Sequence, residues 1–229
     1  MKKNETIISP IAYIRTDFNE KFGIPRQSGL VESLRGRIVF LPEYRNPEAL
    51  RGIEGFSHLW LLFDFSKARG SAWSPTVRPP RLGGNRRIGV FASRSPYRPN
   101  NIGLSSVRLI GIEQSESESR VLIVAGADLL DMTPIFDIKP YLPFTDCHSD
   151  ASGGYADDVY GQKLVPILPD ELFEGIEPLI REAIADCLAE DPRPSYQDDA
   201  ERIYGMKFAG FEIKFRVSDG VATVVAVEK

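Results

Sequence analysis

The sequence predicts a mainly β, α+β protein, and three observations carry that prediction. Short apolar or alternating segments, each bounded by Gly, Pro, Asn or Asp, recur through the first half of the chain, as is typical of β-strands. One segment, beginning at Pro178, repeats its apolar residues at helical spacing. Near the C-terminus an alternating run turns at Asp219-Gly220 and returns, which indicates a β-hairpin.

The composition is typical of globular proteins, with 42% hydrophobic and 26% charged residues among 229. Apolar runs stay well short of the ~20 residues that a membrane helix needs. The N-terminus lacks the apolar core of a secretory signal. Two cysteines, Cys147 and Cys187, form no CxxC motif, and together with two histidines they give no zinc-ligand spacing. We therefore expect a cytoplasmic protein with reduced thiols and no bound metal.

Five N-terminal segments are predicted to be strands: Thr6–Ile14, Gly36–Leu41, Phe56–Phe65, Leu104–Ile112 and Val121–Ala127. The third is nearly all apolar and aromatic, which favours a strand buried on both faces. His58, near its start, is interpreted as a satisfied core or edge histidine rather than a catalyst. Asn46-Pro47 supplies a capping residue and a proline at the first helical position, so a helix of about two turns is expected up to Ile53.

Residues 148–161, rich in Gly, Ser and Asp, contain the predicted domain boundary. We expect three parts: an N-terminal β domain at 1–150, a linker at 151–161 and a C-terminal α+β domain at 162–229. In the last part, the helix from Pro178 ends before Asp191-Pro192, and Cys187 on its apolar stripe is a core residue. Ile203–Val227 forms the hairpin.

Positive charge is concentrated in the middle of the chain. Between Phe65 and Ile112 there is no Asp or Glu, but there are nine Lys and Arg residues. Because the net charge is −4, the rest of the chain carries −13, much of it between Asp150 and Glu201. Such a local excess favours a phosphate-backbone partner, although the whole chain is acidic. A protein-binding face is the alternative.

The stretch from Arg86 to Gly103 is the strongest candidate for a functional loop. A predicted short strand, Ile88–Ala92, leads into a polar turn that Pro96 and Pro99 stiffen. The turn carries planar donors and other polar groups, namely Arg94, Ser95, Arg98, Asn100 and Asn101. A rigid loop of this kind can hold an anionic or polar ligand in a fixed pose. The alternative is a solvated turn.

Two further loops carry binding chemistry. Ser66–Asn85 has neither helical nor strand periodicity, and its Trp73 lies among basic residues, so a base-stacking role competes with a role as a plug over the core. Ile24–Gly29 is a small, rigid polar loop, or a plain surface turn.

The stretch Asp128–Asp146 packs acidic and basic residues between apolar ones and three prolines. Asp137 and Lys139 are two residues apart, so on an extended segment they share a side. This pair suits acid–base chemistry, and a structural ion pair is the alternative.

Familiar phosphate and nucleophile motifs are missing from the sequence. It has no GxGxxG, no GxxxxGK[ST] and no GxSxG. A basic, mainly β domain with converging polar loops suits chemistry in which a bound cofactor supplies the electrophile and the protein orients the reactants. The residues alone do not identify that cofactor.

Five motifs occur together in this chain: VRPPRLGGNRRIGVFASRSPYRPNNIG, DLLDMTPIFDIKPYLPF, IPRQSGLV, GFSHLWLLF and DPRPSY. Together they resemble the tRNA N6-threonylcarbamoyladenosine methyltransferase family (TsaA-like, TrmO type). The resemblance implies a small antiparallel β-barrel that binds S-adenosyl-L-methionine (SAM), joined to a C-terminal helix and β-hairpin domain, and working as a homodimer. It further implies methylation of N6 of threonylcarbamoyladenosine at tRNA position 37.

Carried over by position, the resemblance implies cofactor contacts at Pro25, Arg26, Gln27, Ser66, Lys67, Arg94, Leu104, Asp131, Met132, Thr133 and Pro134. Two departures stand out. Met132 occupies a position where the family commonly has Gly, which leaves the backbone less free. Ser66-Lys67 stands where members of the family have a His-Gln pair.

Residue type and neighbourhood suggest roles for the remaining groups. Asp137 or Asp131, or water, could accept the proton that the attacked nitrogen sheds, with Lys139 beside Asp137. An arginine fork such as Arg98 could clasp the carboxylate of the threonyl arm. The residues expected to contact tRNA are Arg78, Arg81, Arg86, Arg87, Arg98 and Asn100.

Two other functions remain open from the sequence. A non-catalytic barrel could bind RNA or a nucleotide. A hydrolase of a nucleotide-like substrate could use Asp131 and Asp137 as a carboxylate pair, and its activity would not need SAM.

Overall fold

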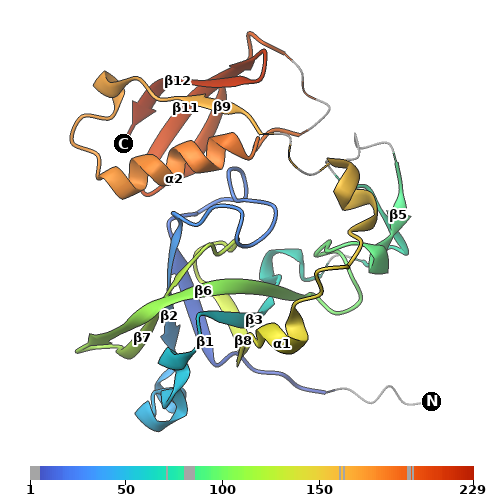
Figure 1. The fold of residues 1–229 in the computed structure, drawn as a ribbon, viewed down its shortest axis with the longest axis vertical. Coiled ribbons are helices and arrows are strands. Elements are labelled where there is room, and N and C mark those ends of the chain that lie inside the picture. Colours follow the sequence, from blue (N-terminus) through green and yellow to red (C-terminus); the bar gives the residue numbers. More distant parts are fainter. Residues whose placement is uncertain are drawn as a thin grey trace.

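The computed structural model describes residues 6–70, 72–79, 86–159, 161, 163–194, 197 and 199–229. Arg81, one of the residues expected to contact tRNA, lies outside this part of the chain. The described residues form two β units, which lie one above the other in Figure 1. The predicted mainly β, α+β class is confirmed.

The N-terminal unit is a closed ring of six strands in the order β1-β2-β7-β6-β3-β8, and every neighbouring pair is antiparallel. The strands are β1 (Ala12–Thr16), β2 (Arg35–Phe40), β3 (His58–Asp64), β6 (Ile102–Ser115), β7 (Ser119–Ala125) and β8 (Thr133–Pro140). A core of alternating apolar residues fills the ring, and Ile14, Leu59, Leu61, Leu122 and Ile135 are fully buried there. The ring closes where β8 pairs with β1, residues more than a hundred positions apart.

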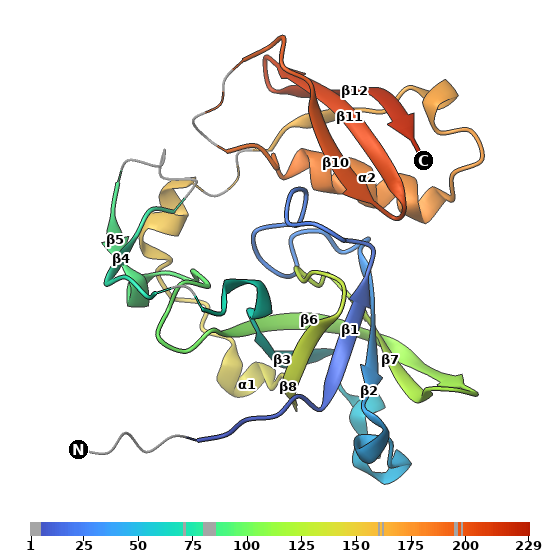
Figure 2. The same cartoon turned by 180° about the vertical axis from the view of Figure 1, so that it is seen from behind.

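Shorter elements lie in the connections between the strands. The 3-10 helices among the described residues are Pro42–Tyr44, Pro47–Leu50, Ile53–Gly55, Ser66–Ala68, Val90–Ala92, Gly154–Val159 and Asp170–Leu172. β4 (Thr76–Val77) and β5 (Ile88–Gly89) form a two-stranded arm that projects from the ring, and α1 (Pro143–Asp146) follows β8 (Figure 2).

The C-terminal unit packs one helix on a sheet. α2 (Pro178–Ala189) covers a four-stranded sheet in the order β10-β11-β12-β9, as far as the described residues show. The strands are β9 (Val165–Ile167), β10 (Tyr204–Phe208), β11 (Phe211–Ser218) and β12 (Val221–Glu228). The helix, its buried Cys187 and the Asp219-Gly220 turn are confirmed.

The two units share a core. Phe18, Val31 and Leu34, from the connection between β1 and β2, belong to the apolar cluster of the C-terminal unit. The ring of Phe18 lies 4.9 Å from that of Phe208. A Cβ at Gly23 would lie 2.4 Å from Cγ of Met206, so this close approach requires glycine. The C-terminal unit is therefore anchored on the β1–β2 connection.

The antiparallel order of the ring determines where the polar loops lie. Because neighbouring strands alternate in direction, the connections 17–34, 65–101 and 126–132 all leave the ring at the same end. We call this the loop end. It carries most of the predicted cofactor residues, and Figure 1 shows the C-terminal unit beside it.

Several predicted elements differ in the structure. The first strand begins at Ala12, not Thr6. The predicted strand Ile88–Ala92 is wrong beyond Gly89, because only the two-residue β4 pairs with it and Val90–Ala92 turns as a 3-10 helix. The expected C-terminal hairpin is larger: β10 precedes it and β9 pairs with β12.

The helix expected from Asn46 to Ile53 is also shorter than predicted. Asn46 caps it as expected, since its Oδ1 accepts from the N–H of Glu48 at 3.0 Å. The turn is a 3-10 helix, however, and Gly52 at φ 84° separates it from a second one.

The expectation that the Phe56–Phe65 strand is buried on both faces is wrong. Leu59, Leu61 and Phe63 face the core, whereas Trp60 and Leu62 face outward and are half-buried.

Candidate functional site

Direct contacts join the three connections of the loop end. The N–H of Gly29 donates to the carbonyl of Gly126 at 2.9 Å, linking 17–34 to 126–132. Gly126 has φ 72°, and a Cβ there would lie 3.2 Å from the backbone of Gly29, so glycine permits the approach. Arg94 Nη1 donates to Gln27 Oε1 at 2.5 Å, linking 65–101 to 17–34. Two predicted cofactor residues from distant parts of the sequence are thus in contact.

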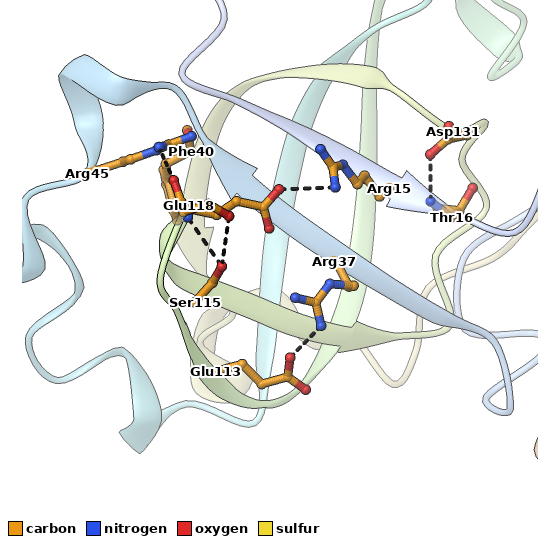
Figure 3. Close-up of polar contacts among 10 residues, drawn as sticks. Arg15, Thr16, Arg37, Phe40, Arg45, Glu113, Ser115, Glu118 and Asp131 are labelled. Atoms are coloured by element: carbon orange, nitrogen blue, oxygen red, sulfur yellow. Dashed lines mark hydrogen bonds and ion pairs between the residues drawn. The ribbon is translucent and has the colours of Figure 1, made fainter.

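Asp131 fixes the end of β1. Its Oδ1 accepts from the N–H of Thr16 at 3.1 Å, and its own N–H donates to the carbonyl of Phe18 at 2.8 Å. Figure 3 shows the carboxylate pointing at the Thr16 backbone. One carboxylate oxygen of this proposed catalytic residue therefore already serves the fold.

The segment after Asp131 runs from an exposed turn into β8. Met132 has φ 59° and is 50% exposed. Thr133 is buried, and its hydroxyl donates to the carbonyl of Leu130 at 2.7 Å. Pro134 lies opposite Tyr13 in the ring. The backbone at Met132 thus adopts the left-handed conformation that glycine prefers.

The loop Pro25-Arg26-Gln27 lies between the two units. Pro25 is buried. Arg26 Nη2 donates to the carbonyl of Arg193 in the C-terminal unit at 2.9 Å, whereas Gln27 contacts Arg94. Adjacent side chains of this loop therefore contact different units.

Ser66 and Lys67 are exposed on the 3-10 helix that follows β3. Arg69 holds this turn through the buried Asp64, with Nη2 to Oδ2 at 2.7 Å and Nε to Oδ1 at 3.1 Å. The N–H of Phe65 donates to the carbonyl of Asn101 at 2.8 Å. The start of this connection is thus tied to the end of the Arg94 loop.

Leu104 and Asp137 lie on the outer wall of the ring. Leu104 is 52% exposed on β6, opposite Leu62, which is itself opposite Asp137 on β8. Lys139 Nζ lies 3.0 Å from Asp137 Oδ2, so the prediction that these residues share a side is confirmed. Both are well exposed, and such a pair adds little to stability.

The two candidate catalytic carboxylates are six residues apart, one before β8 and one within it. Asp131 precedes β8, and Asp137 lies in its middle. From Thr133 to Asp137 alone the strand spans about 13 Å, at ~3.3 Å per residue. The two carboxylates of a glycosidase, which act in one hydrolytic reaction, stand roughly 5–10 Å apart, and those of an aspartic protease stand closer still. The spacing argues against a hydrolase that uses both.

The basic residues lie mainly on the arm and the adjoining loop. Arg78 and Arg86 are exposed, and Arg87 Nε donates to Thr76 Oγ1 at 2.7 Å across the arm. Arg98 Nη1 donates to the carbonyl of Ser93 at 3.2 Å, and Asn100 is exposed. The structure thus gathers Arg78, Arg86, Arg87 and Arg98 on one projecting segment and the adjoining loop.

One residue at the loop end was not among the predicted site residues. Asp128 Oδ1 accepts from the hydroxyl of Ser105 at 2.7 Å. Burial raises the pKa of Asp128, while Ser105, the N–H of Ser28 and the charge of Arg94 oppose that rise. The sequence could have pointed to Asp128, because this acidic residue stands between two apolar ones, Ala127 and Leu129. Both neighbours are buried in the structure.

Trp73 of the long loop is half exposed, so it does not plug the core. His58 Nδ1 lies 2.9 Å from the hydroxyl of Ser57, so one ring nitrogen has a hydrogen-bond partner. Within the described residues, no cluster of three or more His, Cys, Asp or Glu side chains could hold a metal ion. No helix in the described part of the chain is long and apolar enough to cross a membrane.

Known proteins resemble this chain over nearly its whole length. A protein from Escherichia coli K12 named tRNA (adenine(37)-N6)-methyltransferase is 42% identical over 226 residues, covering 95% of this chain and 96% of the relative. A protein of the same name from Eikenella corrodens is 47% identical over 180 residues, covering 75% of this chain and 97% of the relative. The crystal structure of TrmO from Pseudomonas aeruginosa superposes with a TM-score of 0.80 at 36% identity, covering 99% of this chain and 98% of that one.

Two family models divide the chain much as the two units do. The tRNA-methyltransferase O N-terminal domain matches residues 13–147, and the TrmO C-terminal domain matches residues 173–229. The first match covers the strands of the ring and the loop end, and the second covers α2 and β10 to β12. The chain belongs to the tRNA-methyltransferase O family.

Proposed function

We propose that this protein is a SAM-dependent methyltransferase that modifies N6 of adenine 37 in tRNA and acts on the threonylcarbamoyl form of that base. The names of its relatives, which include an S-adenosylmethionine-dependent methyltransferase from Pseudomonas aeruginosa, support the reaction and the cofactor. The observation that carries the proposal is the meeting of Gln27, Arg94 and the 126–132 connection at the loop end.

The residues at the loop end fit SAM, which presents a purine, ribose hydroxyls, an ammonium and a carboxylate. Gln27 and Arg94 offer an amide and a guanidinium, and the 131–134 segment offers backbone groups and a carboxylate. Leu104 and Met132 add exposed apolar surface for the purine. The remaining proposed contacts are Pro25, Arg26, Ser66 and Lys67.

When bound, SAM supplies an electrophilic methyl group, so the protein's task is to position the nucleophile and manage its proton. Asp137, exposed and paired with Lys139, is the proposed acceptor for the N6 proton. Asp131 is the second candidate, with one oxygen already bound by Thr16. Arg98 is proposed to clasp the carboxylate of the threonyl arm.

The proposed tRNA surface is the basic segment between Phe65 and Ile112, which contains nine basic and no acidic residues. Arg78, Arg86 and Arg87 are exposed on the arm. They are proposed to contact phosphates, and such contacts position RNA without reading its sequence.

The proposal includes a homodimer. Ile102 and Ile110 are exposed apolar residues on the outer side of β6. A strip of this kind is typical of a surface that a partner covers, and a second copy is the proposed partner.

The experiment that tests the function uses purified protein, SAM with a labelled methyl group, and two tRNAs. One tRNA carries threonylcarbamoyladenosine at position 37, and the other is an unmodified transcript. Label should appear in the nucleoside from position 37 of the first tRNA only, as measured by mass spectrometry. Failure to bind SAM, or equal labelling of both tRNAs, would refute the proposal.

A further inference from the structure

The turn that follows α2, residues 191–194, reaches the loop end, although the proposed function gives it no role. Arg26 Nη2 donates to the carbonyl of Arg193 in this turn at 2.9 Å. Arg26 immediately precedes Gln27, whose side chain accepts from Arg94 at 2.5 Å. A hydrogen bond therefore joins the C-terminal unit to the loop that carries three of the proposed cofactor residues.

A single carboxylate holds both the backbone and the side chain of Arg193. Asp191 Oδ1 accepts from the N–H of Arg193 at 3.2 Å and from its Nε at 2.9 Å, and Asp191 Oδ2 accepts from its Nη2 at 3.0 Å. The Arg193 side chain is only 11% exposed, and its guanidinium lies over the ring of Tyr204, 5.9 Å from the ring centre. A bidentate pair of this kind fixes geometry as well as adding energy. The carbonyl that accepts from Arg26 therefore belongs to a residue that is held at its N–H and at its side chain.

Asp191 has a backbone conformation that most residues with a Cβ avoid. Its φ is 47°, in the left-handed region, which aspartate tolerates because its side chain can bond locally. Here the side chain does so, through the N–H of Arg193 two residues later. Strained turns persist where their surroundings over-determine them, and they cluster at functional sites. The side chains of this turn thus hold it in one conformation.

The β1–β2 connection is held by the C-terminal unit on both sides of Arg26. Before Arg26, the N–H of Ala209 donates to the carbonyl of Asp17 at 3.1 Å. After it, the hydroxyl of Ser33 donates to Asp186 Oδ2 at 2.5 Å. These contacts join the two units at the ends of the connection, and the bond from Arg26 fixes the loop between them.

We propose that Asp191 and Arg193 are positioning residues of the cofactor site. They hold the carbonyl that orients the Arg26 guanidinium, so that the loop presents Gln27 beside Arg94 to SAM. The C-terminal unit contributes to SAM binding through this contact, and no contact with SAM is assigned to Asp191 or Arg193. This inference rests on the proposed function, since it assumes that the loop end binds SAM.

The test compares Arg193→Met with wild-type protein. This change removes the guanidinium that pairs with Asp191 and keeps an apolar side chain and the carbonyl. We expect SAM affinity, measured by titration calorimetry, to fall about fivefold, the scale of one lost hydrogen bond. With tRNA saturating, KM for SAM should rise by a similar factor while kcat stays the same, because the turn controls cofactor binding. A variant that merely loses folded protein would show the reverse, a lower kcat at an unchanged KM.

The matched control is Arg181→Met, in the same unit. Arg181 also pairs with an aspartate, Asp170, at 2.5 Å, and its guanidinium also lies over an aromatic ring, that of Phe173, at 5.4 Å from the ring centre. Both partners belong to the C-terminal unit, as does Leu168, whose carbonyl accepts from Arg181 Nη2. Loss of this guanidinium should therefore lower stability, measured by urea unfolding, and leave SAM affinity unchanged.

A second variant keeps the inference testable if Arg193→Met does not fold. Asp191→Asn keeps an acceptor for the Arg193 N–H and a residue that tolerates a positive φ, but it loses the charge that pairs with the guanidinium. It should also weaken SAM binding, by a smaller factor than Arg193→Met.

A double variant tests the route of the effect. If Arg193 acts through Arg26, then Arg193→Met should add little to the loss caused by Arg26→Met. Additive losses, an equal loss in Arg181→Met, or unchanged SAM affinity in Arg193→Met (in Asp191→Asn, should Arg193→Met not fold) would overturn the positioning role. Absence of SAM binding by the wild-type protein would instead refute the proposed function, so the two failures can be told apart.

Discussion

Arg94 and Gln27 lie 67 residues apart in the sequence, and their side chains meet at 2.5 Å at the loop end. Gln27→Ala removes the oxygen that orients the guanidinium, so we expect SAM affinity to fall about fivefold, the scale of a neutral hydrogen-bond acceptor. Gln27→Glu keeps an acceptor and should bind SAM better than Gln27→Ala. Titration calorimetry of both variants is the measurement, and equal affinities for them would contradict the orienting role.

Met132 is expected to strain the backbone. A residue with a Cβ at φ 59° costs about 1–2 kcal/mol relative to glycine, and half of the Met132 side chain is exposed, so little packing is lost. Met132→Gly should therefore raise the melting temperature by about 2–4 °C, the shift expected for ~1 kcal/mol in a chain of this size.

Ser119→Gly is the matched control for Met132→Gly, since Ser119 has φ 64° at the opposite end of the ring. It should also stabilise, but only the change at Met132 should alter SAM affinity. Calorimetric melting with and without SAM separates these effects. A lower melting temperature in Met132→Gly would contradict the prediction. It would show that packing of the Met132 side chain stabilises the protein by more than the backbone strain costs.

Local chemistry explains which elements the sequence could predict. Asn46-Pro47 and Asp219-Gly220 act within a few residues of themselves, and the structure confirms the cap and the turn. The alternation of β11 and the stripe of α2 likewise need no distant partner to be recognised. Strand Ile88–Ala92 was over-predicted because its apolar pattern says nothing of the length of its partner β4.

Long-range contacts explain what the sequence could not predict. The cluster that joins Phe18 to Phe208 depends on residues 190 positions apart, and no local pattern marks them as partners. The same holds for Arg26, whose bond to the Arg193 carbonyl joins the loop of residues 25–27 to the C-terminal unit. Asp128 was visible as an acid between apolar residues, but its hydrogen bond from the Ser105 hydroxyl joins residues 23 positions apart.

The ion pair between Arg69 and Asp64 should matter for stability because Asp64 is 4% exposed. Arg69→Met leaves this buried carboxylate without its bidentate partner, and we expect a loss of about 2–3 kcal/mol, less than for a fully buried pair because Arg69 is 61% exposed. Urea unfolding measures it. Asp64→Asn combined with Arg69→Met should recover part of the loss.

The control for the Arg69 prediction is Arg51→Met. Arg51 pairs with Glu48, and both side chains are mostly exposed, so the expected loss is below about 0.5 kcal/mol. Similar losses in the two variants would mean that the burial of Asp64 is not what makes its pair important.

The pKa of Asp128 predicts a pH dependence of stability. Burial raises this pKa above its ordinary value of 3.8 in the folded protein. The protonated form is thus favoured by folding, and its stabilising contribution is present at low pH and lost as the pH rises through the folded pKa. Wild-type protein should therefore lose stability relative to Asp128→Asn as the pH rises from 4 to 7, measured by urea unfolding. A difference in unfolding free energy between the two proteins that does not change with pH, or that shifts in favour of the wild type as the pH rises, would contradict the raised pKa.

Asp137 and Asp131 can be distinguished as proton acceptors by their rate constants at saturating SAM and tRNA. Removing a general base costs about a hundredfold or more. If Asp137 is the base, Asp137→Asn should lower kcat by that factor, whereas Asp131→Asn, which retains an acceptor for the Thr16 N–H, should affect kcat much less.

Lys139→Met is the control, because it removes the partner of Asp137 without removing the carboxylate. It should lower kcat less than Asp137→Asn does. An unchanged kcat in Asp137→Asn would exclude Asp137 as the base, and a large loss in Asp131→Asn alone would assign the role to Asp131. If neither substitution lowers kcat, the proton passes to water, and the carboxylates serve binding and structure only.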